Sequence, residues 1–561
     1  MRYQNCAATA ALIVILCGCA ATQPNTDYED DVLLAQRAGA PLFEGMGTYT
    51  KPITTQSQGA QRYFDQGMVL AFGFNHAESI RSFRAAQKLD PACAMCFWGE
   101  ALATGPNINV TADGKALMLP DAQVAAYAAI QQASALKSTA TPKEQALIEA
   151  LAQRYASKPV DDRADYDIAF AREMGELNAR YPADDDIAAI YAEAWMNTMP
   201  WDYWSDGDTP RPETVPVINA LETILARNPE HPLALHLYIH AVEASSRPER
   251  AEQAADTLAA LVPGSGHLVH MPSHIYWRIG RYHDASVANI NAAAVDERYI
   301  AQCNAQGFYP ALYYPHNIHF LWAASSMEGR SAVAIEAARK VAANVRLEQI
   351  EQFPSVEFFH TIPLLALVQF GRWDDVLEEP APNEALHFSR AIWHYSRAIA
   401  SANSGDSLGA KREHDALRAL KNSDKIEFLV RMAYPATTLL DIADHLIAGE
   451  ISLVSGDYDD AIVHFSEAVS LQDTLPYMEP PFWYYSTRQS LGVALLKAEQ
   501  FDEAERVYRD DLAHFPRNGW AMFGLAQALD GLGRTTDAAQ VRLLFRKAWA
   551  MADVELMSSR M

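Results

Sequence analysis

Two pairs of histidines in this 561-residue chain have the spacing of metal ligands. His236 and His240 are four residues apart, as are His270 and His274, and residues four apart share one face of a helix. Corresponding members of the two pairs are 34 residues apart, the length of one helix–turn–helix unit in a repeat array. Neighbouring units place equivalent residues side by side, so the four imidazoles are predicted to lie on one wall of a helical array. Such an arrangement suits a transition metal.

Further histidines and two glutamates extend this set. Gly280 and Gly329 mark the phase of two successive repeats, and each is preceded by a histidine at ten residues and another at thirteen. The predicted ligands are His236, His240, His270, His274 and His319. The residues expected either to bind the metal or to orient a ligand are His316, Glu243 and Glu193. Nitrogen-rich ligation favours copper or zinc, with iron in third place, and this many donors allows a dinuclear site.

Two other interpretations of the histidines stay open at this point. They could line a groove that binds an acidic or aromatic peptide, or they could be packed core residues. Pro272 lies between His270 and His274, and proline is poorly tolerated inside a helix. If Pro272 begins a helix instead, the spacing does not fix the direction of His270. Pro315 raises no such conflict, because it can begin the helix that carries His316.

The chain that must position these residues is predicted to be helical from about Gln61 onward, because no alternating strand pattern occurs. In each repeat, small residues let two antiparallel helices approach and large residues fill the space between them. A proline then ends the second helix of the repeat. An early example comprises Tyr63, Gly67, Phe83, Ala86 and Pro91, and a late one comprises Gly492, Phe501, Ala504, Tyr508 and Pro516. This pattern resembles the tetratricopeptide repeat family. The resemblance implies an all-α helix–turn–helix solenoid whose concave groove binds partners.

Three motifs also resemble a bacterial subfamily of tetratricopeptide proteins, to which no activity is attached. They are CAMCFWG at 93–99, HMPSHIY at 270–276 and YYPHNIH at 313–319. The predicted organisation is a signal peptide at 1–18, a tether at 19–58, a degenerate repeat region with the histidines at 59–400, and regular repeats at 401–561. Two segments interrupt the repeats, from Asn107 to Thr141 and from Met199 to Pro216. Each is either a functional loop or a packed connector.

The N-terminus has the features of an export signal. Arg2 precedes an apolar run from Ala7 to Leu16 that is too short to span a membrane. The segment Leu16-Cys17-Gly18-Cys19 resembles the bacterial lipobox, which implies that Cys19 is acylated after residues 1–18 are removed. The neutral Ala20 then implies an outer-membrane lipoprotein, with the body expected to face the periplasm. The alternative is an ordinary secretory signal.

Three cysteines follow the lipobox: Cys93, Cys96 and Cys303. In an oxidising compartment, Cys93 and Cys96 are expected first to form a disulfide, then to bind metal, and last to be free thiols. The formal net charge of −25 argues against binding nucleic acid or an anionic lipid surface, so membrane contact is expected only through the lipid anchor.

The sequence contains no HExxH helix, GxSxG elbow or phosphate-binding glycine loop, which disfavours the common hydrolase and nucleotide-binding functions. The predicted function is metal binding in the repeat groove, and a catalytic role would be metal-activated water or oxygen chemistry. The alternative is a non-catalytic scaffold that uses the repeats from about residue 446 to bind an envelope protein or peptide.

Overall fold

The computed structural model describes residues 31–112, 115–303 and 309–561, and it confirms the all-α prediction for them. The helices of the first half are α1 (Asp31–Ala38), α2 (Gln58–Phe72), α3 (His76–Leu89), α4 (Ala94–Thr104), α5 (Pro120–Leu136), α6 (Pro142–Ala152), α7 (Ala164–Arg180), α8 (Asp185–Thr198), α9 (Thr214–Arg227), α10 (Pro232–Glu243), α11 (Glu252–Leu261), α12 (Gly266–His270), α13 (Pro272–Arg278) and α14 (Tyr282–Cys303). Those of the second half are α15 (Tyr314–Met327), α16 (Ser331–Asn344), α17 (Leu347–Gln352), α18 (Ile362–Gln369), α19 (Trp373–Glu378), α20 (His387–Asn403), α21 (Ser407–Lys421), α22 (Asp424–Arg431), α23 (Ala436–Ser455), α24 (Tyr458–Asp473), α25 (Arg488–Lys497), α26 (Phe501–His514), α27 (Gly519–Gly531) and α28 (Thr535–Ala548).

Short elements connect some of these helices. Strands β1 (Thr111–Ala112) and β2 (Lys115–Ala116) pair antiparallel. Short helices of other types are η1 (Lys137–Thr139), η2 (Pro248–Ala251), η3 (Tyr309–Tyr313) and η4 (Pro354–Thr361). The segment from Asn107 to Thr141 therefore contains the strand pair and α5, and α5 packs against α4 and α6.

Consecutive helices pack against one another along the chain, which makes the molecule a tetratricopeptide-like solenoid. The predicted pairing of small and large residues holds it together: Gly67 on α2 and Gly99 on α4 both face the buried ring of Phe83 on α3. A methyl group at either glycine would overlap that ring. Gly280 and Gly329, the two phase markers, end their helices with positive φ angles of 76° and 71°, which glycine adopts without strain.

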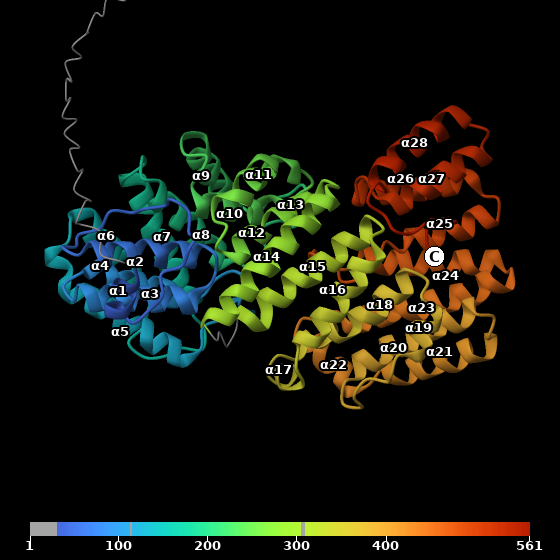
Figure 1. Cartoon of the computed structure of the whole chain (residues 1–561), viewed down its shortest axis with the longest axis horizontal. Coiled ribbons are helices and arrows are strands. Elements are labelled where there is room, and N and C mark those ends of the chain that lie inside the picture. Colours follow the sequence, from blue (N-terminus) through green and yellow to red (C-terminus); the bar gives the residue numbers. More distant parts are fainter. Residues whose placement is uncertain (1–30, 113–114, 304–308) are drawn as a thin grey trace, which may run out of the picture.

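Two hydrophobic clusters form the core of the described residues. The first runs from Leu34 to Ala324 and the second from Trp277 to Leu556, so they overlap around α13 to α15. Figure 1 shows the corresponding two lobes, with α15 and α16 between them. The predicted boundary at residue 400 separates degenerate from regular repeats. The division into two hydrophobic clusters is a different property and does not test that boundary.

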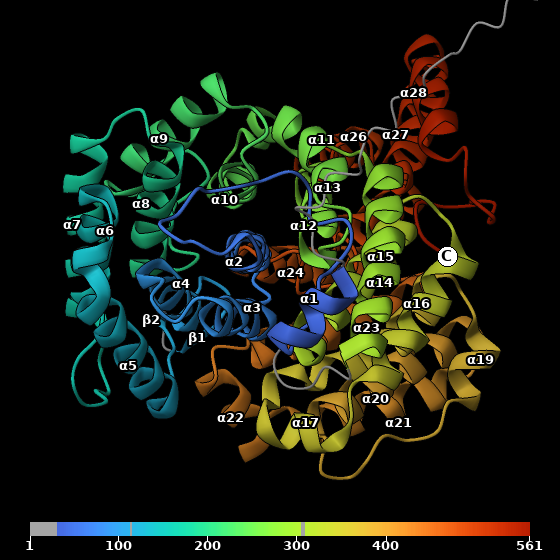
Figure 2. The same cartoon turned by 60° about the vertical axis from the view of Figure 1, so that its left-hand side comes forward.

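The first lobe curls back on itself, so that helices far apart in sequence become neighbours. Helix α2 packs against α10, and Figure 2 shows both near the middle of the ring formed by the surrounding helices. The backbone amide of Gly264 donates to the carbonyl of Gly45 over 2.9 Å, which joins the segment before α2 to the turn before α12. Part of the predicted tether is thus folded, since Leu34 and Ala40 are buried.

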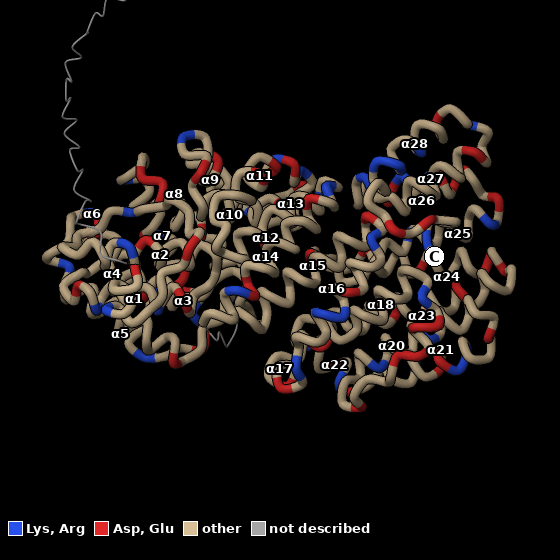
Figure 3. The backbone as a smooth tube through the Cα atoms, in the orientation of Figure 1, with Lys and Arg blue, Asp and Glu red and all other residues tan. Residues whose placement is uncertain are grey.

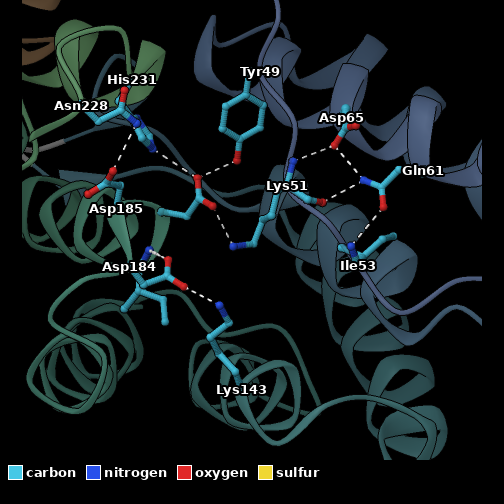
Figure 4. A network of polar contacts seen from close by, with 12 residues as sticks. Tyr49, Lys51, Ile53, Gln61, Asp65, Lys143, Asp184, Asp185, Asn228 and His231 are labelled. Atoms are coloured by element: carbon cyan, nitrogen blue, oxygen red, sulfur yellow. Dashed lines mark hydrogen bonds and ion pairs between the residues drawn. The ribbon is translucent and has the colours of Figure 1, made fainter.

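A hydrogen-bond network centred on Asp186 fixes this N-terminal segment, and Figure 4 labels its partners Tyr49, Lys51 and His231. The Asp186 carboxylate accepts hydrogen bonds from the Tyr49 hydroxyl over 2.7 Å, from Lys51 Nζ over 2.9 Å and from His231 Nε2 over 3.2 Å. Burial alone would raise the pKa of Asp186, but the hydrogen bond from His231 and the charge of Lys51 hold it well below its usual range. Asp186 therefore links the segment before α2 to α8 and α10.

Charged residues of both signs are distributed over the outer helices of both lobes, as Figure 3 shows. None of the helices within 31–112, 115–303 and 309–561 is both long enough and apolar enough to cross a lipid bilayer.

We predict that Asp186→Asn destabilises the protein at neutral pH by about 2 kcal/mol, because hydrogen bonds to a charged acceptor are lost. The pKa of Asp186 is lower in the folded state than in the unfolded chain. Its contribution to the free energy of unfolding is therefore complete above about pH 4 and is lost progressively as the pH falls below that value. The difference between the wild type and the variant should therefore shrink at about pH 2.5. Thermal unfolding followed by circular dichroism tests this, with the exposed Asp161→Asn as the control. A difference that stays constant across this pH range would contradict the assignment.

Candidate metal centre

Segments of the first lobe and helix α15, which lies between the lobes, carry the histidines. Helix α10 supplies His236, His240 and Glu243, and it begins at Pro232, where a missing amide hydrogen costs nothing. Helices α12 and α13 supply His267, His270 and His274, and α15 supplies His316. Contacts of α10 with α13, and of α12 with α15, bring these segments together.

The first group, here called the first triad, comprises His236, His240 and His267. One ring nitrogen from each lies within 4.8 Å of the others. All three residues are at most 2% exposed. The expected open groove is therefore an enclosed site in the structure, because the curl of the first lobe places α2 and the residues after it over α10.

The second group, here called the second triad, comprises His270, His274 and His316, whose ring nitrogens also lie within 4.8 Å of one another. It adjoins the first triad: the ring centroids of His267 and His270 are 5.8 Å apart, and those of His240 and His274 are 5.6 Å apart. The two triads thus form one continuous cluster of six imidazoles.

Pro272 does not separate the ligands of the second triad. Helix α12 ends at His270 and α13 begins at Pro272, so the proline occupies a first turn, where it is tolerated. Met271, between the two helices, keeps helical φ and ψ angles of −50° and −37°, so the chain continues in nearly the same direction. His270 at the end of α12 and His274 in α13 therefore remain neighbours, with their Nε2 atoms 2.9 Å apart.

Each histidine of α10 is held through Nδ1. His236 Nδ1 donates to the carbonyl oxygen of Phe72 over 2.6 Å, and His240 Nδ1 donates to Glu243 Oε1 over 2.6 Å. A carbonyl or carboxylate can only accept, so both rings carry their proton on Nδ1 and a lone pair on Nε2. Both Nε2 atoms are buried and have no hydrogen-bond partner among the described residues. A buried unpaired polar atom costs roughly 1–3 kcal/mol, so a donor or a cation between these nitrogens would stabilise the site.

The second triad is held in the same way. His270 Nδ1 faces Asn289 Oδ1 at 2.7 Å, and His274 Nδ1 donates to Glu243 Oε2 over 2.6 Å. The Asn289 amide nitrogen donates elsewhere, to the Ala285 carbonyl, which makes its oxygen the acceptor for His270. Both rings therefore direct Nε2 at each other, and only a shared cation, a proton or a metal ion, can make that contact favourable.

Carboxylates set the charge of this cluster. Burial would raise the pKa of Glu243, but the positive charge of His274 and the hydrogen bonds from His240 and His274 hold it well below its usual range. Burial would lower the pKa of His274, but Glu243 and Glu479 raise it to about 10. His274 Nδ1 lies 3.3 Å from Glu479 Oε2, and the single hydroxyl proton of Tyr477 is shared between the two glutamates. One imidazolium therefore faces two buried carboxyl groups.

The other five histidines are neutral. Burial in an apolar setting lowers the pKa of His236, His240, His267, His270 and His316. Neutral imidazole is the form that binds a metal ion, so the cluster offers lone pairs without first releasing protons at these positions.

Aromatic rings cover the first triad from two loops. The Phe74 ring centroid lies 4.6 Å from that of His236, and the Trp201 centroid lies 5.1 Å from that of His240. Both residues have positive φ angles, 55° and 64°, which side chains other than glycine adopt at a cost. Trp201 belongs to the segment from Met199 to Pro216, and Trp204 in the same segment donates to the Ala241 carbonyl over 2.9 Å. This segment is packed, and it covers the site.

Glu243 contacts both triads without belonging to either, whereas two other predicted residues, His319 and Glu193, lie away from them. His319 packs against Trp322, Phe358 and Phe359. Glu193 on α8 is near Arg154, and burial raises its pKa to about 7. Among the described groups able to hold a metal ion, neither residue takes part.

The structure adds His267, Asn289 and Glu479 to the predicted site. His267 lies thirteen residues before Gly280, as His316 lies thirteen residues before Gly329, and this equal spacing is the sequence signal that points to His267. Asn289 and Glu479 give no sequence signal, because their roles depend on contacts between distant segments. Glu479 comes from the loop after α24, so the C-terminal repeats contribute to the histidine cluster.

Cys93 and Cys96 form a disulfide at the start of α4. Cys303 is a free thiol at the end of α14. The predicted signal peptide and Cys19 lie outside the described residues.

Comparisons with known proteins give no family assignment. No protein-family model matches the chain, and no curated protein is significantly similar to it. Among solved structures, a human IFIT1 dimer with m7Gppp-AAAA is 11% identical, with a TM-score of 0.29 over 90% of this chain and 92% of that one. Yeast Tom70 is 11% identical, with a TM-score of 0.29 over 88% and 92%. The Cut9 complex with Hcn1 is 13% identical, with a TM-score of 0.29 over 88% and 76%. Such low scores carry no functional argument.

We predict that Trp201→Gly exposes His240 to chemical modification. Glycine accepts the positive φ at this position, so the loop should keep its path while the covering ring is removed. Peptide mass spectrometry after diethyl pyrocarbonate treatment should show several-fold faster modification of His240, with half-exposed His283 as the internal control. An unchanged rate at His240 would show that Trp201 does not limit access.

Proposed function

We propose that this protein binds transition-metal ions, copper or zinc, through the two histidine triads. The observation that carries the proposal is the shared orientation of four rings: Nδ1 is held by an oxygen acceptor, and Nε2 points into the cluster. Histidines that ligate metals are oriented in this way, because the second hydrogen bond fixes the tautomer and increases the basicity of the ligand nitrogen.

The spacing of the donor atoms supports the proposal. Two nitrogens that bind one ion at about 2 Å lie about 3 Å apart, close to the 2.9 Å between His270 Nε2 and His274 Nε2. In the first triad, the unpaired Nε2 atoms of His236 and His240 would be satisfied by an ion. Two adjacent groups of three imidazoles suit two ions. Glu243 would orient one ligand of each ion, because it accepts hydrogen bonds from His240 in the first triad and from His274 in the second.

The donor set suggests which metal is bound. Six imidazoles and no thiolate favour copper or zinc over magnesium or calcium, which prefer oxygen ligands. The carboxylate of Glu243, whose pKa is held below its usual range by His274 and His240, provides negative charge that offsets the charge of a bound cation.

A second function, protein interaction, is supported by the architecture. A tetratricopeptide-like solenoid exposes long helical surfaces, and several apolar side chains of the C-terminal hairpins are exposed: Val454, Val463, Leu543 and Leu544. The groove over the histidines is enclosed, so a protein or peptide partner would bind elsewhere, on these outer surfaces.

We further propose that the chain is an outer-membrane lipoprotein anchored through Cys19 and facing the periplasm. The lipobox-like segment supports this location. In cells fed an alkyne-modified fatty acid, Cys19→Ala should abolish lipid labelling and release the protein from the membrane fraction, while Cys17→Ala should do neither. Equal labelling of the wild type and Cys19→Ala would refute the anchor.

The metal proposal predicts the metal content of specific variants. Wild-type protein purified without a histidine tag should contain one or two equivalents of copper or zinc by plasma mass spectrometry. His240→Ala combined with His274→Ala removes one donor from each triad, and the metal should be lost while helicity is retained. Glu243→Gln keeps every ligand but replaces an acceptor with an amide, so affinity should fall about 10- to 100-fold.

A second histidine pair provides a matched control. His445 and His464 are in contact, with their Nδ1 atoms 3.2 Å apart, but they lie on α23 and α24, outside both triads. Replacing both with alanine should leave the metal content unchanged. Equal metal content in the His240/His274 double variant and the wild type would refute the proposed site.

A further inference from the structure

An apolar cavity of 180 Å³ lies beside the second triad, within the second hydrophobic cluster. Helices α15, α18, α20 and α23, together with η4 and the loop after α24, contribute its walls. Most of the lining is aromatic or aliphatic, and its large side chains include Trp322, Tyr434 and Trp483.

The cavity and the proposed metal site share two side chains. His316 belongs to the second triad and also lines the cavity. Glu479 approaches His274 on one side and lines the cavity on the other. A molecule in the cavity would therefore lie in direct contact with a ligand of the second triad.

The volume and lining select the kind of molecule. A cavity of about 150 Å³ lined by aliphatic and aromatic side chains is large enough for benzene. The present cavity, at 180 Å³, therefore has room for one six-membered ring with a small substituent. The adjacent carboxyl group of Glu479 and the apolar lining disfavour an anion, because nothing that lines the cavity offers a positive charge from lysine or arginine.

The wall contains polar groups that are unpaired among the described residues: the indole nitrogens of Trp322 and Trp483, which can only donate, and the imidazole of His319, which can donate or accept. His319 is 6% exposed, lines the cavity, and makes no hydrogen bond with any other described residue. Burial lowers the pKa of His319 to about 3, so the ring is neutral and has both a donor and an acceptor nitrogen. A ring hydroxyl can donate to one nitrogen or accept from the other.

We propose that this cavity binds a simple phenol, with the ring against the aromatic wall and the hydroxyl on His319, next to the second triad. Binding of the phenol depends only on the cavity. The presentation of that phenol to a bound metal ion rests on the function proposed above.

The test is calorimetric titration of the full-length protein, with and without its metal, using phenol, toluene and benzoate. Phenol should bind about tenfold more tightly than toluene, the value of one hydrogen bond, and benzoate should not bind. His319→Phe keeps an aromatic ring in the wall and should reduce phenol to the affinity of toluene. His360→Phe makes the same replacement at a histidine outside the cavity and should change nothing.

A second variant tests the location. Val356→Phe should fill the cavity and abolish phenol binding, and an unchanged metal content would show that the protein is folded. Equal affinity for phenol and toluene in the wild type, or phenol binding unaffected in both His319→Phe and Val356→Phe, would overturn the proposal. Phenol binding by a protein that never takes up metal would overturn the proposed function and leave the cavity assignment in place.

Discussion

The carboxylate of Glu243 is the contact on which the two triads depend, because one oxygen accepts from His240 and the other from His274. Transferring a carboxylate out of water costs several kcal/mol, and only hydrogen bonds and an opposite charge can offset that cost. Here His274 supplies the charge, and Tyr477 donates a further hydrogen bond. The same carboxylate therefore orients one imidazole of each triad, so the two groups behave as one electrostatic unit.

The curl of the first lobe provides the burial that makes these interactions strong. Bringing α2 beside α10 lets the Phe72 carbonyl orient His236 and lets the Phe74 ring cover the first triad. Removal of water lowers the local dielectric constant, which strengthens each charge–dipole contact and penalises each unpaired atom. The positive φ angles of Phe74 and Trp201 show that the backbone accepts strain where these rings meet the histidines.

The sequence predicted the fold and part of the site because both are encoded at short range. The repeat period placed His236, His240, His270 and His274 on neighbouring helices, and the structure brings them together. The enclosure was not predictable, because the curvature of a solenoid is the sum of small rotations between repeats. Glu479 was not predictable for a related reason: its loop reaches His274 only through the packing of the second lobe on the first.

The contribution of Glu479 has a consequence for the order in which the molecule is assembled. The N-terminal segments of a large protein generally fold before its C-terminal segments. The histidines can gather once α15 has been made, yet the second carboxyl group arrives only with the loop after α24. A partly folded chain in which this loop has not yet packed would thus hold six imidazoles with Glu243 as their one carboxyl partner among the described residues, and the polar surroundings of His274 are completed late in folding.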